Sequence, residues 1–534
     1  MNSNKSFNRF IMLLAIVAIA AVVFHRFDNR NVYSSDSIRE QLQRFNEVFA
    51  MINQYYVEPP DREDIVTGAI NGMLNELDPH SVYITEENLQ RVTEQFEGSF
   101  QGIGIEFVIL NKVLTVVAPI VGGPSEAVGI LPGDQIVEIE GESTYGITED
   151  EVQEKLRGPK GTKVNVTIRR PGLSETFEVT ITRDDIPIYS VMAAFMLEDS
   201  ETGYIYLGRF ARTTSQEVED ALDELQAQGM KQLIFDLRGN SGGYLDQAFE
   251  VADKFIPGGY KIVYTKGRIR NADQEFFSSD RGTHALFPLV VLIDHGSASA
   301  SEIVSGAVQD LDRGLVLGQT SFGKGLVQNQ LPLQGGGAIR LTVARYYTPS
   351  GRLIQRPYED GTLVDYYQDA YDDSSKAGKI DSSKQFLTLA GRTVYGGGGI
   401  TPDSILTSDK ITRFTNRLLM KRVFFEFGSN WAGEHRDAYS DFEQFSNEFT
   451  VTDEMVNELK AIIEKHEIEF SQEAYDKDVD YIHLLMKAEI ARHIWDREHY
   501  YRVRIKGDSE VQHARDLMHE AERIKNLHAW QGMN

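Results

Sequence analysis

The sequence predicts a multidomain α/β protein with a helical region at each end. A chain of 534 residues is too long for a single hydrophobic core. Short strands separated by Gly/Pro turns fill residues 96–185, and strands alternate with helices over residues 186–403. The second pattern is typical of a largely parallel sheet. We therefore expect a β-rich module and an α/β core, flanked by helical regions at residues 37–95 and 404–534.

The first helical region has apolar residues at helical spacing over residues 37–57, and the prolines of "EPPD" end that helix. A second helix, "REDIVTGAINGMLNEL", runs up to "DPHS". The β-rich module then contains one helix, "TEDEVQEKLRG". Its strands are "GIGIEFVI", "VLTVVAPI", "DQIVEIEG", "KVNVTIRR" and "ETFEVTIT".

In the α/β core, the buried strand "KQLIFDL" is followed by the turn "RGNSGG" and the helix "YLDQAFEVADKFI". "PLVVLID" is a second buried strand, "GLVLGQT" is a third, and "AIRLTVARYYTPSG" is a longer strand ending in a turn. Amphipathic helices fill the region after residue 404. No motif there indicates chemistry.

The charge balance excludes one class of partner. The chain has 54 Lys and Arg against 80 Asp and Glu, a net charge of −26, whereas binding to phosphates needs a cationic face. We expect no nucleic-acid partner. The absence of cysteine excludes disulfides, thiolate catalysis and Cys-ligated metals.

The first 30 residues resemble an export signal. Two cations, Lys5 and Arg9, precede the continuously apolar segment 11–24, and no small-residue cleavage site follows. We favour an uncleaved signal anchor over a cleaved signal peptide. The remaining chain is then expected in the periplasm or on the periplasmic face of the inner membrane.

The stretch "DHGSASASEIVSGAVQDL", residues 294–311, places alternating serines at the start of a helix that follows a buried strand. "SASE" fits a capping box with Ser299 as the N-cap, so a structural cap is a good reading of this serine. A helix N-terminus also offers free N–H groups that can stabilise an oxyanion. The same position therefore suits a nucleophile, provided that a base is available.

The best-placed base is a lysine. No GxSxG elbow surrounds these serines. His295 precedes the helix and has no evident acid partner, and His80 lies in "LDPHS", which looks like a turn. Lys324 lies between two glycines directly after a buried strand, where desolvation can make it a base. A solvated loop lysine is the alternative. A phosphate loop is disfavoured because GxxxxGK[ST] is absent.

"GSASASEIVSGAVQD" followed by "SFGKGLVQ" resembles the carboxyl-terminal processing proteases, also called tail-specific proteases. The resemblance makes Ser299 the nucleophile and Lys324 the base. It makes Gln328 the residue that holds the lysine, which a strand permits because both side chains then share a face. It also implies that the N–H groups of Gly242 and Ala300 bind the oxyanion. No metal or cofactor is implied.

The resemblance covers roughly residues 40–405, through "LDPHSVYI", "DLRGNSGG", "TVARYYTPSGR" and "GGGITPD". It implies a crotonase-like (ClpP/crotonase) protease core with an inserted PDZ module. Asp310 is interpreted as structural. Residues 404–534 lie outside it and are expected to form an extra helical domain.

The module at 96–185 is similar to a circularly permuted bacterial PDZ domain. Its "GIGI" resembles a carboxylate-binding loop, in which the N–H groups of Ile103, Gly104 and Ile105 can face one anionic chain end. By resemblance, Arg157 in "LRGPKGT" contacts the protease core and couples peptide binding to activity. The expected partners are protein substrates with exposed, apolar C-termini, and a homo-oligomer (a dimer) is also expected.

These observations predict a serine endopeptidase that recognises protein tails and cleaves them by a Ser–Lys acyl-enzyme mechanism. The alternative is a non-catalytic PDZ adaptor that presents tails to another protease. An acyl-CoA enzyme with the same core fold is disfavoured, because a PDZ module has no use there. The sequence does not identify the substrate.

Overall fold

The computed structural model describes residues 37–198, 200–280, 284, 286–358, 363–371, 384–406, 410–435 and 438–527. The chain divides into two compact units, Met1–Asp78 and Pro79–Asn534. In the first unit, a helix over residues 37–55 precedes α2 (Arg62–Asn75), which Asp61 caps. None of the described helices is both long and apolar enough to cross a membrane. The apolar segment 11–24 lies outside the described residues.

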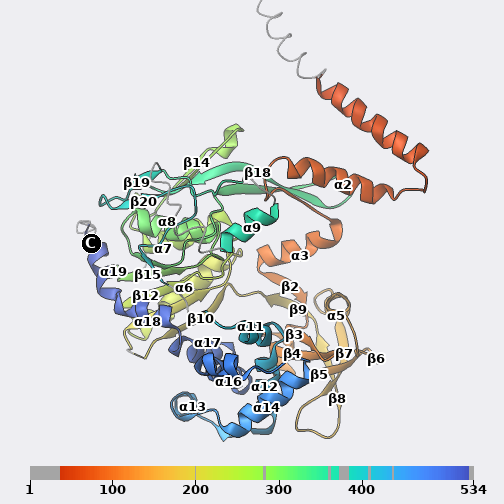
Figure 1. The fold of residues 1–534 in the computed structure, drawn as a ribbon, viewed down its shortest axis with the longest axis vertical. Helices are drawn as coiled ribbons and strands as arrows, with labels where there is room; N and C mark the ends of the chain where they lie inside the picture. The colour runs from red at the N-terminus through yellow and green to blue at the C-terminus, as the bar shows by residue number, and fades with distance from the viewer. Residues whose placement is uncertain are drawn as a thin grey trace, which may run out of the picture. The chain divides into compact units, whose positions relative to one another are not determined.

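A six-stranded sheet forms the centre of the second unit (Figure 1). Its strands, in spatial order, are β10 (Val191–Met196), β11 (Thr202–Leu207), β12 (Gln232–Asp236), β15 (Leu289–Ile293), β16 (Leu315–Gly318) and β21 (Ser404–Ile405). The strands from β11 to β21 are parallel, and only β10 pairs antiparallel. The predicted largely parallel sheet is therefore confirmed.

Both faces of this sheet are covered by helices. The side chains of β15 alternate, because Leu289, Val291 and Ile293 lie in one core cluster and Val290 and Leu292 in another. The first cluster is closed by three helices from within the core. These are α6 (Thr214–Ala227), α7 (Leu245–Phe255) and α8 (Ala300–Asp310).

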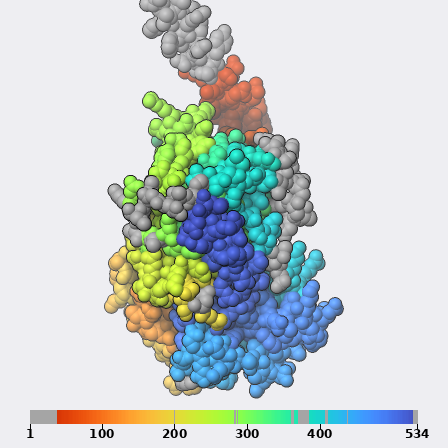
Figure 2. Space-filling view, turned by 90° about the vertical axis from the view of Figure 1, so that its left-hand side faces the viewer, coloured from red at the N-terminus to blue at the C-terminus, as the bar shows by residue number. Residues whose placement is uncertain are grey.

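The second face is closed by helices from the far end of the chain. Apolar residues of α17 (Arg497–Lys506), α18 (Ser509–Asp516) and α19 (Met518–Lys525) pack on this face. Figure 2 shows the last helices, in dark blue, lying along the core. The last helices of the expected C-terminal helical region therefore pack on the core sheet. Their apolar positions match the apolar side chains on this face of the sheet.

The strand "AIRLTVARYY" belongs to a second sheet, which is antiparallel. This sheet contains β1 (Val82–Ile84), β13 (Lys261–Gly267), β14 (Gln274–Phe277), β17 (Leu326–Pro332) and β18 (Ala338–Tyr347). β17 and β18 form its hairpin. The other described elements of the core are the 3-10 turn η1 (Arg270–Ala272), helix α9 (Leu363–Tyr371) and the paired strands β19 (Gln385–Leu387) and β20 (Thr393–Tyr395).

The β-rich module is attached through a two-stranded neck, in which β2 (Ser99–Gly102) pairs with β9 (Asp184–Pro187). The sheet of the module contains β3 (Ile105–Leu110), β4 (Val113–Pro119), β5 (Gln135–Ile139), β6 (Glu142–Ser143), β7 (Lys163–Arg169) and β8 (Phe177–Thr182). Its helices are α4 (Pro124–Ala127) and α5 (Glu149–Leu156). Helix α3 (Glu86–Glu97) directly precedes the neck.

A helical bundle follows the core and has an apolar centre of its own. Its helices are α11 (Arg413–Met420), α12 (Val423–His435), α13 (Phe442–Glu448), α14 (Asp453–Lys465), α15 (Gln472–Lys477) and α16 (Val479–Ile494). Phe425 of α12 packs against Val108 and Val117 of the β-rich module. The bundle therefore contacts the β-rich module.

Candidate active site

Ser299 lies at the N-terminus of α8 with an unusual backbone conformation. Its φ is 54° and its ψ is −110°, whereas an ordinary N-cap residue is extended. A non-glycine residue with positive φ is strained, by on the order of 1–3 kcal/mol, and such strain clusters at functional sites. Ser299 therefore differs from a simple helix cap.

The neighbouring serines have structural hydrogen bonds. The buried hydroxyl of Ser297 donates to the carbonyl oxygen of Leu237 at 2.8 Å. The buried hydroxyl of Ser301 donates to the carbonyl oxygen of Asn240 at 2.8 Å. Both bonds join the serine segment to the loop after β12. Of these three alternating serines, Ser299 is the one that lines the cleft described below.

Lys324 and Gln328 are in direct contact. The Lys324 Nζ donates to the Gln328 Oε1 at 2.9 Å, and the Gln328 Nε2 donates to the carbonyl oxygen of His80. Strand alternation alone does not explain this contact, because Lys324 precedes β17 and the β17–β18 register shifts between Val327 and Gln328. The amide of Gln328 thus bridges the lysine to the turn that contains His80.

The backbones of Ser299 and Lys324 are tied together at two points. The Glu302 Oε2 accepts from the N–H of Ser299 at 2.8 Å and from the N–H of Lys324 at 2.9 Å. The Tyr346 hydroxyl lies 3.0 Å from the carbonyl oxygen of Ser299 and 2.7 Å from that of Lys324. Two residues far apart in the sequence are thereby held in a fixed relation.

Glu302 is fully buried, and its other oxygen is also used. Its Oε1 accepts from the Ser321 hydroxyl at 2.5 Å and from the Gly323 N–H at 2.7 Å. Burial raises the pKa of Glu302, and the hydrogen bonds that it accepts act in the opposite direction. Burial likewise raises the pKa of Tyr346, which keeps its hydroxyl protonated as a donor.

Ser299 and Lys324 lie in the wall of one cleft, which has a volume of about 570 Å³. Ser299, Lys324 and Gln328 line it together with the loop 241–245. The other lining residues come from α3, α8, β17 and β18: Thr93, Phe96, Glu97, Ile303, Leu326, Val327, Gln330, Arg340 and Tyr346. A mixed apolar and polar cleft of this size is a common setting for catalysis. Neither His80 nor His295 is among its lining residues.

Gly242 and Ala300 lie beside Ser299. A Cβ at Gly242 would come within 2.8 Å of the Ser299 Cβ and 2.9 Å of the Ala300 nitrogen, so only glycine fits there. Ala300 begins α8, so its N–H has no partner within the helix. The N–H of Gly242 donates to the Asn240 Oδ1 at 2.9 Å. An oxyanion at this position must therefore compete with the Asn240 amide.

The loop at Ile103, Gly104 and Ile105 directs two N–H groups away from Ser125 and Ile120. The carbonyl of Ile103 accepts from the Ser125 hydroxyl at 2.6 Å, and the carbonyl of Gly104 accepts from the Ile120 N–H at 2.9 Å. In a trans peptide the N–H points opposite to the carbonyl, so the N–H groups of Gly104 and Ile105 face away from these donors. Gly104 has a φ of 73°, which suits glycine.

Arg157 joins the module to helix α3. It ends α5, forms an ion pair with Glu94 of α3, and lies 4.9 Å from the centre of the Phe100 ring. The neighbours of Glu94 on α3, Thr93, Phe96 and Glu97, line the cleft. Helix α3 therefore connects the ion pair of Arg157 to the wall of the cleft.

Several supporting residues were not identified from the sequence. Asn240 and Tyr346 act through buried hydrogen bonds between distant segments, and no local pattern indicates such bonds. Glu302 had a signal, since it is the glutamate of the "SASE" capping box. Asp310 forms a fully buried ion pair with Arg352 at 2.7 Å and does not line the cleft, in keeping with a structural role.

Replacing Glu302 with glutamine is expected to impair both stability and turnover. A neutral amide offers one accepting oxygen, so at least two of the four donors now face an NH₂ group. Each unsatisfied buried donor costs about 1–3 kcal/mol. Chemical denaturation should give the loss of unfolding free energy, and peptide cleavage should fall even where the chain remains folded.

The matched control is Glu151→Gln, because Glu151 occupies the same capping-box position in the exposed helix α5. Because glutamine also completes a capping box, this exposed change should leave stability and turnover close to those of the unmodified chain. Equal effects of the two substitutions on turnover would contradict the role of Glu302 in tying the two backbones.

Four family models match the sequence. That of peptidase family S41 matches residues 201–366, and a PDZ-domain model matches residues 115–170. The model of the activating protease CtpB N-terminal domain matches residues 21–88. A family of unknown function matches residues 414–496, within the helical bundle.

Similar proteins carry related names. A carboxy-terminal-processing protease of Bartonella bacilliformis is 38% identical over 349 residues, 65% of this chain and 80% of that protein. The carboxy-terminal processing protease CtpA of Bacillus subtilis is 33% identical over 378 residues, 69% of this chain and 80% of that protein. Among solved structures, the photosystem II D1 C-terminal processing protease is 27% identical with a TM-score of 0.33, covering 62% of this chain and 97% of that one.

Proposed function

We propose that this chain, which belongs to peptidase family S41 and is a serine-type carboxy-terminal processing protease, cleaves peptide bonds with Ser299 as nucleophile and Lys324 as general base. The observation that carries this assignment is the shared cleft, in which Glu302 and Tyr346 tie the two residues together. The proposed core fold is crotonase-like, with an inserted PDZ module.

In the proposed first step, the neutral amine of Lys324 accepts the hydroxyl proton of Ser299, and the Ser299 Oγ attacks the scissile carbonyl. Gln328 orients the amine, because its Oε1 accepts from the Nζ at 2.9 Å. The protonated lysine then delivers its proton to the leaving amine. Water hydrolyses the acyl-enzyme, with Lys324 again accepting a proton.

The negative charge of the tetrahedral intermediate is proposed to lie between the N–H groups of Ala300 and Gly242. The Ala300 N–H also benefits from the positive end of the α8 dipole. The Gly242 N–H first has to leave the Asn240 Oδ1 or share itself with that oxygen. We infer that substrate binding shifts this hydrogen bond.

The C-terminal tail of the substrate is proposed to bind the PDZ module, with its carboxylate at Ile103, Gly104 and Ile105 and its last residues along β3. The direction of two of these N–H groups, away from Ser125 and Ile120, supports this binding mode. Arg157 is proposed to pass tail binding on to the cleft through its ion pair with Glu94.

Location and assembly are further proposals. The cationic and apolar residues before residue 30 support export, with the enzyme anchored on the periplasmic face of the inner membrane or released into the periplasm. We propose a homodimer. We further propose that residues 96–185 form the PDZ domain, residues 186–403 the protease core and residues 404–534 a helical C-terminal domain, whose last helices support the core.

The test of the catalytic assignment is covalent labelling. A serine-directed phosphonate probe should modify the chain once, at Ser299, and the label should disappear in the Ser299→Ala chain. Labelling at another serine, with Ser299 unmodified, would contradict the assignment.

Free-acid substrates are expected to be cleaved faster than identical substrates with an amidated tail. Hydrogen bonds to a carboxylate are roughly twice as strong as those to a neutral amide. Gly104→Ala should remove this preference, because a Cβ there strains a φ of 73° and comes within 3.0 Å of the Ile186 side chain. Competition between the two substrates in one reaction measures the ratio of their rates.

Gly146→Ala is the matched control. Gly146 also has a positive φ, of 81°, and belongs to the same module, but no atom lies within 4 Å of its added Cβ. The preference for the free acid should survive this change. Equal rates on both substrates with the unmodified enzyme would mean that the "GIGI" loop does not bind the tail carboxylate.

A further inference from the structure

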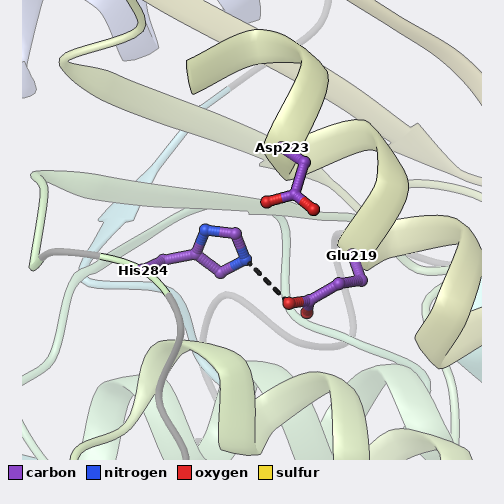
Figure 3. Close-up of side chains that lie close together, drawn as sticks. All are labelled: Glu219, Asp223 and His284. Atoms are coloured by element: carbon purple, nitrogen blue, oxygen red, sulfur yellow. Dashed lines mark ion pairs between the residues drawn. The ribbon is translucent and has the colours of Figure 1, made fainter. Parts of the chain in front are cut away.

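A second group of side chains with chemical potential lies on helix α6, apart from the residues that line the cleft. Glu219 and Asp223 are one helical turn apart on α6, and His284 approaches them from the segment before β15 (Figure 3). One nitrogen or oxygen atom from each of these three residues lies within 4.8 Å of the other two. None of the three belongs to the catalytic machinery proposed above.

The imidazole of His284 is held in one orientation. Its side chain is only 1% exposed, and its Nδ1 lies 3.0 Å from the Gln226 Oε1. An amide oxygen can only accept, so the Nδ1 carries the proton. In the neutral ring the Nε2 is then a bare acceptor, and this buried nitrogen has no hydrogen-bond partner.

The bare Nε2 faces a carboxylate. Figure 3 shows the ring directed at Glu219, and the Nε2 lies 3.3 Å from the Glu219 Oε1. Two lone pairs cannot face one another at this distance without a positive charge between or on them. The arrangement therefore needs either a cation between the two atoms or a second proton on the ring.

The separation itself favours a metal ion. Two ligand atoms that each lie 2.0–2.1 Å from a tetrahedral zinc ion are about 3.3–3.4 Å apart. A charge-assisted hydrogen bond between an imidazolium and a carboxylate is usually about 2.7–2.9 Å long. The observed 3.3 Å agrees with the first geometry and is long for the second.

The surroundings resemble the outer shell of a metal site. Gln226 fixes the tautomer of His284, as outer-shell partners of metal-bound histidines do. Lys254 donates to the Glu219 Oε2 at 2.6 Å, which orients the carboxylate, and the Oε1 is the oxygen that faces the His284 ring. Glu219 and Asp223 carry two negative charges and Lys254 carries one positive charge. The net negative charge of these three groups favours binding of a divalent cation. Asp223 is exposed, so its side chain can rotate toward such an ion.

We propose that Glu219, Asp223 and His284 bind one divalent transition-metal ion, with Zn²⁺ the best fit, and that water supplies the fourth ligand. Its role is structural. The ion fastens the segment before β15 to α6, and β15 leads directly into the loop that ends at Ser299. It takes no part in the peptidase chemistry.

The test is equilibrium dialysis of the full-length chain, without a polyhistidine tag, against chelator-buffered Zn²⁺. The wild type should bind one ion per chain. His284→Ala should lower the affinity by more than 100-fold. Gln226→Leu removes no ligand and should lower the affinity by about 10–100-fold, because the ring loses its orientation. His519→Ala is the control, since this exposed histidine lies on α19 beside an acid.

Cobalt gives an independent readout. Wild-type chain loaded with Co²⁺ should show the intense visible absorption of a tetrahedral site, and the His284→Ala chain should not. The same Zn²⁺ affinity in wild type and in His284→Ala, with no tetrahedral Co²⁺ spectrum, would overturn the proposal. His284 would then be an imidazolium paired with Glu219.

Discussion

Replacing Ser299 with alanine is expected to lower peptide cleavage by on the order of 10⁴-fold or more while the chain stays folded. The hydroxyl is the group proposed to attack the scissile carbonyl, and Ser299 is the cleft serine whose backbone Glu302 and Tyr346 tie to that of Lys324. Steady-state turnover and thermal unfolding, measured on the same preparation, check both parts of this expectation.

A helix cap predicts the opposite pattern. If Ser299 only capped α8, alanine would cost about 0.5–2 kcal/mol of stability and turnover would persist. Ser297→Ala and Ser301→Ala are the matched controls. Each removes a buried hydroxyl that donates to a backbone carbonyl, so each should cost about 1–3 kcal/mol with turnover largely retained in the folded chain. Unchanged turnover in the Ser299→Ala chain would remove the nucleophile assignment.

The substitution Ser299→Gly distinguishes the effect of backbone strain on stability from the effect of the lost hydroxyl on activity. The φ of 54° is strained for serine or alanine but accessible to glycine. Ser299→Gly is therefore expected to be as inactive as Ser299→Ala and more stable than it by about 1–3 kcal/mol. A stability no higher than that of Ser299→Ala would mean that this backbone stores no strain.

Replacing Lys324 with alanine is expected to be as damaging as replacing Ser299, and the double variant should be no worse than either. Residues that act as one unit are strongly non-additive. Lys324→Arg should also be inactive, because a guanidinium stays protonated and cannot act as a base. Because only the neutral amine accepts a proton, wild-type turnover should rise with pH as the lysine loses its proton.

The substitution Gln328→Leu distinguishes the role of Lys324 as the base from the role of Gln328 in orienting the lysine amine. It removes the acceptor that lies 2.9 Å from the Nζ but leaves the amine in the cleft. Turnover should fall less than in Lys324→Ala, and the pH profile should move. Activity that persists in Lys324→Ala, or that rises toward acid pH in the wild type, would indicate another base.

The local patterns of the sequence were enough to predict most elements of the core. The strand "PLVVLID" and the serine helix appear where the apolar runs indicated, because burial on both faces leaves a continuous apolar signal. All of α8 is buried, and its polar residues pair with other segments, as Asp310 does with Arg352.

Contacts between distant segments could not be predicted in this way. The Oε2 of Glu302 accepts hydrogen bonds from the N–H groups of both Ser299 and Lys324. The imidazole of His80 was considered as a base, but it is the backbone carbonyl of His80 that takes part, by accepting from Gln328. A carbonyl is present at every residue, so the sequence contains no sign of which one will accept a hydrogen bond. The competition of Asn240 for the Gly242 N–H is invisible for the same reason.

The sequence by itself determined the kind of chemistry, because residue types at fixed spacing, "SASASE" and "SFGKGLVQ", limit which nucleophile and base are available. It also determined the α/β pattern and the β-rich module, since periodicity is a local property. Only the tertiary structure decided that the last helices close the second face of the core sheet, and that Ser299 takes a strained backbone. Both depend on which surfaces meet, and packing between distant segments overrides the preferences of either segment alone.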